Sequence, residues 1–132
     1  MKKSLIALAF GTLALGMTEF VMMGILADVA NALGITIPQA GHLVSAYALG
    51  VTCGAPLLAV AKQFRPKSIL LFLVCLIFIG ALISSVAQSY EMLLVARFIS
   101  GLPHGAYFGV ASIVAVRLAD EGHKTGAVST MI

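Results

Sequence analysis

Residues 68–87 read SILLFLVCLIFIGALISSVA, a run of apolar and small residues without a charged side chain. A helix rises about 1.5 Å per residue, so about 20 apolar residues cross the roughly 30 Å hydrocarbon core of a membrane. Three further stretches have the same character, at residues 4–27, 40–61 and 92–116. Inside the four stretches the only charged residues are Glu19 and Arg97. The sequence therefore predicts an all-α membrane protein with four transmembrane helices.

The composition argues against a soluble protein. Of the 132 residues, 61% are hydrophobic and 10% are charged, and the mean hydropathy is +1.08. Soluble domains are about 45–50% apolar and about 25% charged. The basic residues lie dispersed between apolar stretches, so the pI near 9.1 does not indicate a nucleic-acid partner. The sequence shows no nucleotide-binding loop or metal-ligand cluster, and we expect no enzyme activity, no metal and no cofactor.

Basic residues fall on one side of the predicted membrane. They precede the first stretch, occupy the second connection and follow the fourth stretch, at Lys2, Lys3, Lys62, Arg65, Lys67, Arg117 and Lys124. The first and third connections contain the acids Asp28 and Glu91 but no Lys or Arg. Cytoplasmic loops carry an excess of Lys and Arg, so the pattern predicts a multi-pass protein of the cell inner membrane with a cytoplasmic N-terminus.

The connections carry signals for helix ends. Thr36 or Ile37 precedes Pro38, which suits the first turn of the second helix, and Ser89 can cap the fourth helix with Glu91 in its first turn. Prolines inside the second and fourth stretches predict bends. From about residue 125 the chain again becomes small and apolar, which predicts the start of a fifth helix.

The fourth stretch contains a spaced pattern of one arginine and three glycines. Arg97, Gly101, Gly105 and Gly109 recur every four residues and so form one stripe along a helix. Glycines in such a stripe let a neighbouring helix approach closely, and we expect them to serve helix packing. A guanidinium inside a membrane span is costly and must face protein or water, so we expect Arg97 to be functional.

Glu19 is the predicted partner of Arg97. Both residues lie at a similar depth from the outer ends of their stretches. Opposite charge favours an ionised Glu19 and apolar burial favours a protonated one, so a proton, a cation or Arg97 would compete for it. The alternative is a static ion pair that fixes helix register. His104, about two turns beyond Arg97, either joins this polar pathway or is an ordinary interior histidine. Tyr47, Thr52 and Tyr107 are further candidates for hydrogen bonding on cavity walls.

Three segments resemble the major facilitator superfamily. Arg97-x-x-x-Gly101-x-x-x-Gly105 resembles the family's arginine and glycine motif, in which the arginine is associated with proton coupling. GMTEFVMMGIL at 16–26, Gly41-His42 to Gly50, and GLPHGAYFG at 101–109 are similar to the drug:proton antiporter branch, in particular the arabinose efflux permease group. The loop cluster of Lys62, Arg65 and Lys67 resembles the family's cytoplasmic gating loop without its acid, and Ala27-Asp28 stands where the group commonly has a proline.

The resemblance implies part of a proton-coupled efflux transporter for sugars or drugs, working by alternating access. Its partners would be a small-molecule substrate, protons, and the C-terminal helices that complete the family's two-part fold. Residues 1–132 would then be an incomplete N-terminal transmembrane domain, unable by itself to complete a transport cycle. Two alternatives stay open at this point. One is a complete four-helix antiporter of the small multidrug-resistance type that acts as a dimer, and the other is a membrane fragment that does not transport.

Overall fold

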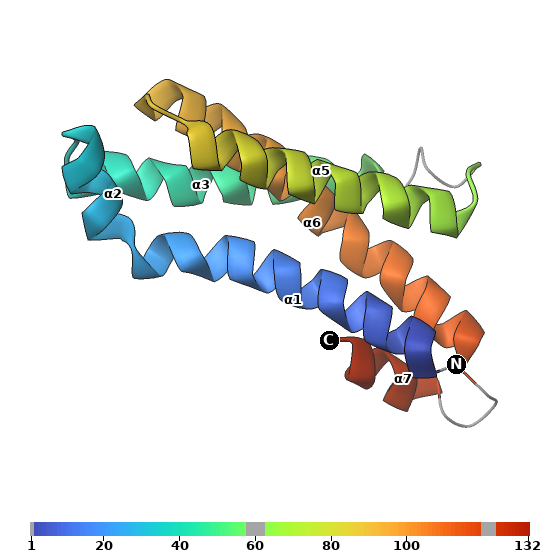
Figure 1. The fold of residues 1–132 in the computed structure, drawn as a ribbon. Coiled ribbons are helices and arrows are strands. Elements are labelled where there is room, and N and C mark those ends of the chain that lie inside the picture. The colour runs from blue at the N-terminus through green and yellow to red at the C-terminus, as the bar shows by residue number, and fades with distance from the viewer. Residues whose placement is uncertain (1, 58–62, 120–123) are drawn as a thin grey trace.

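The computed structural model describes residues 2–57, 63–119 and 124–132, and every regular element in these ranges is an α-helix. The helices are α1 (Lys2–Gly24), α2 (Leu26–Leu33), α3 (Ile37–Gly54), α5 (Pro66–Val86), α6 (Tyr90–Leu118) and α7 (Lys124–Met131). The long helices α1, α3, α5 and α6 run alternately in opposite directions (Figure 1). Within the bundle, α6 packs against α1, α3, α5 and α7. The predicted all-α architecture is confirmed, and α6 is its central element.

Three of the described helices are long and apolar enough to cross a membrane. They cover Lys3–Gly24, Pro66–Val86 and Tyr90–Leu118, with 22, 21 and 29 residues. The remaining long helix, α3, has 18 residues and is shorter than the predicted stretch 40–61. It ends at Gly54, and Ala55 and Pro56 form a turn before the helical Leu57, since proline has no N–H to continue the ladder; the predicted bend at Pro56 stays a prediction. The end of that stretch, residues 58–61, lies outside the described residues.

The outer end of the first stretch also differs from the prediction. The structure has α1 end at Gly24 and α2 begin at Leu26, where we expected one helix to residue 27 and then a loop. The short helix forms because its apolar residues Leu26, Val29 and Leu33 pack on a small cluster of Met22, Leu43 and Leu93. It ends at Leu33 and is capped by Gly34, whose φ of +63° is left-handed and therefore suits glycine.

Two predicted helix starts are confirmed. Thr36 caps α3 in a capping box, in which its side chain accepts from the Gln39 N–H and the Gln39 side chain accepts from the Thr36 N–H. Ser89 caps α6 by accepting a hydrogen bond of 3.2 Å from the Met92 N–H. The caps satisfy backbone donors that a helix end leaves open, and so define where α3 and α6 begin.

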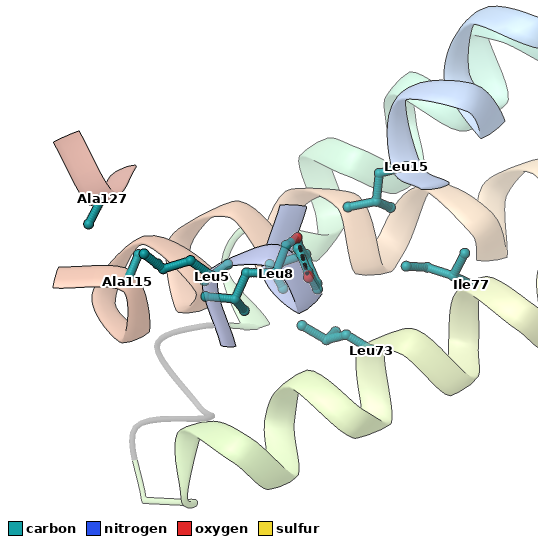
Figure 2. Packing of buried hydrophobic residues seen from close by; sticks show 10 residues of the cluster. Leu5, Leu8, Leu15, Leu73, Ile77, Ala115 and Ala127 are labelled. Carbon is teal, nitrogen blue, oxygen red and sulfur yellow. Dashed lines mark hydrogen bonds between the residues drawn. The ribbon is translucent and has the colours of Figure 1, made fainter. Parts of the chain in front are cut away.

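A core of buried apolar side chains joins α1, α5, α6 and α7. Figure 2 shows this cluster, which consists of Leu5, Leu8, Leu15, Leu73, Ile77, Ala106, Tyr107, Ala111, Ala115 and Ala127. The alanines all come from α6 and α7, which lets these helices approach the larger leucines of α1 and α5. This packing fixes α1 and α6 next to each other, and both carry the predicted charged residues.

Glycines bring α3 and α6 into backbone contact. A Cβ added at Gly101 would overlap the Tyr47 carbonyl oxygen, and one added at Gly105 would overlap the Val51 carbonyl oxygen. Gly50 and Gly54 of α3 face the carbonyl oxygens of Phe98 and Leu102 in the same way. In this arrangement α6 lies against α3 with no room for side chains. Gly109, on the next turn of α6, is half-buried, and its predicted packing role stays a prediction.

Candidate functional site

Arg97 is held between α1 and α3. Its side chain is 3% exposed, and Nη1 donates a hydrogen bond of 2.7 Å to the Thr18 carbonyl oxygen of α1. The guanidinium carbon lies 4.5 Å from the centroid of the Tyr47 ring of α3, a distance at which the cation is attracted to the ring face. Nε and Nη2 have no hydrogen-bond partner among the described residues. The arginine thus ties three helices together around one buried positive charge.

Glu19 contacts His104 and not Arg97. Its Oε2 lies 3.9 Å from His104 Nδ1, and no ion pair with Arg97 occurs in the described parts of the chain. The predicted pairing of Glu19 with Arg97 is therefore wrong for this structure. Successive residues of a helix are rotated by about 100° about its axis, so the Thr18 backbone carbonyl can accept from Arg97 while the Glu19 side chain faces the histidine two turns further along α6. The Glu19 side chain is 40% exposed and the His104 side chain 16%.

Tyr47 is the shared partner of Arg97 and His104. Its hydroxyl oxygen lies 2.9 Å from His104 Nδ1, while its ring lies under the guanidinium. The side chain is 2% exposed, and a buried tyrosine hydroxyl needs a partner. Sequence reasoning named Tyr47 as a hydrogen-bonding candidate but missed that it links the other two residues. The sequence contained one signal for this link: Tyr47 is a tyrosine inside an apolar span, on the helix that faces the glycine stripe.

A cavity of about 550 Å³ adjoins Glu19 and His104. Its walls come from α1, α6 and α7 and the residue after α7, and consist of Ala9, Thr12, Leu13, Gly16, Met17, Glu19, Phe20, His104, Phe108, Thr130 and Ile132. The volume lies within the range of about 300–1,000 Å³ that is usual for small-molecule sites. Most of the lining is apolar, with the carboxylate and the imidazole as its ionisable groups. Arg97 and Tyr47 lie behind this wall and do not line the cavity.

The other predicted polar residues lie elsewhere. Tyr107 donates a hydrogen bond of 3.0 Å to the Leu8 carbonyl oxygen and belongs to the core, while the Thr52 hydroxyl bonds its own helix at Ala48. Arg65 precedes α5 and Lys67 lies in its first turn, both exposed. Lys62 of the predicted basic cluster lies outside the described residues. The described residues contain no group of His, Cys, Asp or Glu that could hold a metal ion.

Comparison with known proteins identifies the family. The pattern of the Major Facilitator Superfamily matches residues 8–132. The chain belongs to the Major Facilitator Superfamily. This membership confirms the resemblance found in the sequence, and it makes the chain a multi-pass membrane protein of a transporter family. It also shows that the alternative assignment to the small multidrug-resistance type was wrong. That alternative depended on the chain length, the four spans and a glutamate in the first span, and these features do not distinguish the two classes.

Individual relatives support the same assignment. The Escherichia coli (strain K12) protein AraJ is 48% identical over 100% of the chain, which covers 34% of AraJ. The inner membrane transport protein YdhP of the same organism is 41% identical over 96% of the chain, and the match covers 33% of YdhP. The chloramphenicol resistance protein of Streptomyces lividans is 30% identical over 95% of the chain, and the match covers 32% of that protein. The chain thus spans about a third of the length of the curated relatives it matches.

Proposed function

We propose that this Major Facilitator Superfamily chain forms the first part of a secondary transporter that exports small molecules in exchange for protons. The observation that carries the proposal is the contact between Glu19 and His104 beside the cavity. Ionisable side chains within membrane helices are costly and typically mark ion or proton pathways. Here a carboxylate and an imidazole, both able to gain or lose a proton, face a space large enough for a small molecule.

The proposed coupling uses Glu19 as the group that is either protonated or ionised. Cargo and proton would then occupy the site alternately, because protonation removes the charge of Glu19 and so changes the affinity of the site for cargo. Arg97 supplies a fixed positive charge behind the cavity wall, held by the Thr18 carbonyl and the Tyr47 ring. The remaining helices of the transporter would complete the binding site, since family members hold substrate near the midplane between two related halves.

The proposed cargo is a sugar or a drug-like molecule. The apolar side chains of Leu13, Met17, Phe20 and Phe108 form much of the cavity wall and favour apolar cargo. One relative is named for chloramphenicol resistance, which is compatible with efflux of such a compound. Thr12 and Thr130 add hydroxyl groups that a more polar cargo could use. Both cargo classes therefore belong in a transport assay.

We also propose an inner-membrane location with the N-terminus in the cytoplasm. Figure 1 shows the start of α1, the start of α5 and the end of α6 at the same end of the bundle. Lys3, Arg65, Lys67 and Arg117 lie at these helix ends. Asp28 and Glu91 belong to α2 and to the first turn of α6, at the opposite end. The positive-inside rule supports this orientation, and a green fluorescent protein fused to the N-terminus should fluoresce in the cytoplasm if it is right.

Gradient-driven transport tests the proposed function. We would replace the matching part of AraJ with this chain, reconstitute the chimera in liposomes, and impose a proton gradient. At least one of arabinose, chloramphenicol and rhodamine 6G should move against its own gradient. Glu19→Gln should abolish this movement, while Glu91→Gln, the same change in an exposed residue at the start of α6, should leave it intact. Wild-type transport by the Glu19→Gln chimera would contradict the proposal.

A further inference from the structure

The hydrogen bond between Tyr47 and His104 has two possible directions. Either the Tyr47 hydroxyl donates to a bare Nδ1, or a protonated Nδ1 donates to the Tyr47 oxygen across the same 2.9 Å. The choice decides which ring nitrogen of neutral His104 carries the hydrogen. It also decides whether the nitrogen that faces the Glu19 carboxylate is an open base, since Glu19 lies 3.9 Å from that same Nδ1.

Burial favours donation by Tyr47. The tyrosine is 2% exposed, and the His104 contact is the one hydrogen bond of its hydroxyl in the described structure. If Nδ1 donated instead, the hydroxyl hydrogen would be buried without an acceptor, which is unfavourable. His104 lines the cavity.

Neighbouring rings keep the imidazole in place for this bond. The His104 ring packs edge-on against Tyr47 at a centroid distance of 5.8 Å and an interplanar angle of 78°. On α6 itself, Phe108 lies 5.1 Å from the imidazole centroid. The ionisable groups that contact His104 are Glu19 of α1 and Tyr47 of α3, Arg97 of α6 contacts Tyr47, and α7 contributes Thr130 to the same cavity. Among these groups, the Tyr47 hydroxyl alone makes a hydrogen bond to the imidazole.

We propose that Tyr47 is a positioning residue of proton coupling, whose hydroxyl holds neutral His104 in the tautomer with its hydrogen on Nε2. Nδ1 is then the nitrogen that receives a coupled proton, beside Glu19. When that proton binds, the bond from the Tyr47 hydroxyl breaks, and the new N–H on Nδ1 can donate to the Tyr47 oxygen or to the Glu19 carboxylate. This inference deepens the proposed transport function and rests on it for its biological meaning, although the tautomer itself can be measured without transport.

Histidine NMR tests the proposal directly. The 132-residue chain, labelled with ¹⁵N-histidine, would be placed in lipid nanodiscs at alkaline pH, where imidazole is neutral. His104→Asn assigns the His104 signals among the three histidines. Tyr47→Phe keeps the ring under Arg97 and removes only the hydroxyl. The matched control is Tyr90→Phe, which removes a hydroxyl 3.2 Å from His42 Nδ1, nearer the start of α3.

The wild-type chain should show His104 with its hydrogen on Nε2. Tyr47→Phe should shift the tautomer ratio toward Nδ1 by roughly two- to tenfold, the factor that corresponds to one hydrogen bond. Tyr90→Phe should leave His104 unchanged. A hydrogen on Nδ1 in the wild-type chain would overturn the proposal even if the Tyr47 variant failed to fold. A folded Tyr47→Phe chain with the wild-type ratio, its helix content checked by circular dichroism, would also overturn it. Neither result depends on whether the protein transports.

Discussion

Replacing Gly105 with alanine should separate α3 from α6. The added methyl group would overlap the Val51 carbonyl oxygen and lie 2.8 Å from the Ala55 nitrogen. Both are backbone atoms, so no side chain can rotate away, and the helices must move apart by about 1 Å to restore ordinary contact distances. A gap of about 0.5–1 Å forfeits a quarter to a half of the attraction at each contact along the interface.

The expected loss of stability follows from two opposing effects. Overpacking costs about 1–3 kcal/mol, and the backbone contacts place Gly105→Ala near the upper end of this range. Alanine is a better helix former than glycine by about 1 kcal/mol, which offsets part of the cost. We therefore expect the free energy of unfolding to fall by about 1–2 kcal/mol. The control is Gly41→Ala in α3, where an added Cβ would meet no described atom within 4 Å.

Titration with sodium dodecyl sulfate in mixed micelles, followed by circular dichroism, measures this difference. Gly105→Ala should unfold at a lower detergent fraction than the wild-type chain. Gly41→Ala should unfold at the same fraction or a higher one, since it gains helix propensity without a clash. Equal stability of the two variants would refute the reasoning, because it would mean that α3 and α6 do not touch through their backbones at Gly105.

Three further substitutions test other contacts by the same titration. Tyr107→Phe removes the buried hydrogen bond to the Leu8 carbonyl oxygen and should cost about 0.5–1.5 kcal/mol; an unchanged midpoint would argue against this contact between α6 and α1. Thr36→Ala removes the cap of α3, with its reciprocal bond to Gln39, and should cost about 1 kcal/mol, whereas Thr36→Ser should restore most of it. Arg97→Lys replaces the guanidinium that lies over the Tyr47 ring and donates to the Thr18 carbonyl oxygen, and should cost about 1–2 kcal/mol, because the shorter-reaching ammonium cannot make both contacts; wild-type stability would show that these two contacts contribute little.

The helices could be predicted because lipid imposes strict demands on the chain. A membrane offers no hydrogen-bond partner to the backbone, so long apolar stretches must be helical. The caps at Thr36 and Ser89 were visible as local sequence patterns, because the first N–H groups of a helix need acceptors and Thr and Ser hydroxyls supply them. The break after Gly24 was missed because the sequence stays apolar across it, and the short α2 is stabilised by contacts with Leu43 and Leu93, which are distant in the sequence.

The sequence predicted which residues belong to the site but not which of them touch each other. Depth in the membrane could be estimated from residue number, and it placed Glu19 and Arg97 at similar levels. Which of them touch depends on the rotation of each helix about its axis, and a step of one residue changes this by about 100°. As a result Thr18, next to Glu19, receives the Arg97 hydrogen bond, while Glu19 meets His104. The role of Tyr47 could not be predicted, because the sequence does not show which side of α3 faces α6. The packed structure shows that Tyr47 lies on this side.

The most direct test of the central claim separates cargo movement from proton coupling. In liposomes that contain the chimera with AraJ, labelled cargo would be measured under two conditions, with an imposed proton gradient and in exchange against unlabelled cargo without a gradient. Glu19→Gln should lose the gradient-driven accumulation but keep the exchange, because the cavity remains and only the group that changes charge is gone. Accumulation that is unchanged in Glu19→Gln, with exchange also unchanged, would contradict a role of Glu19 in proton coupling.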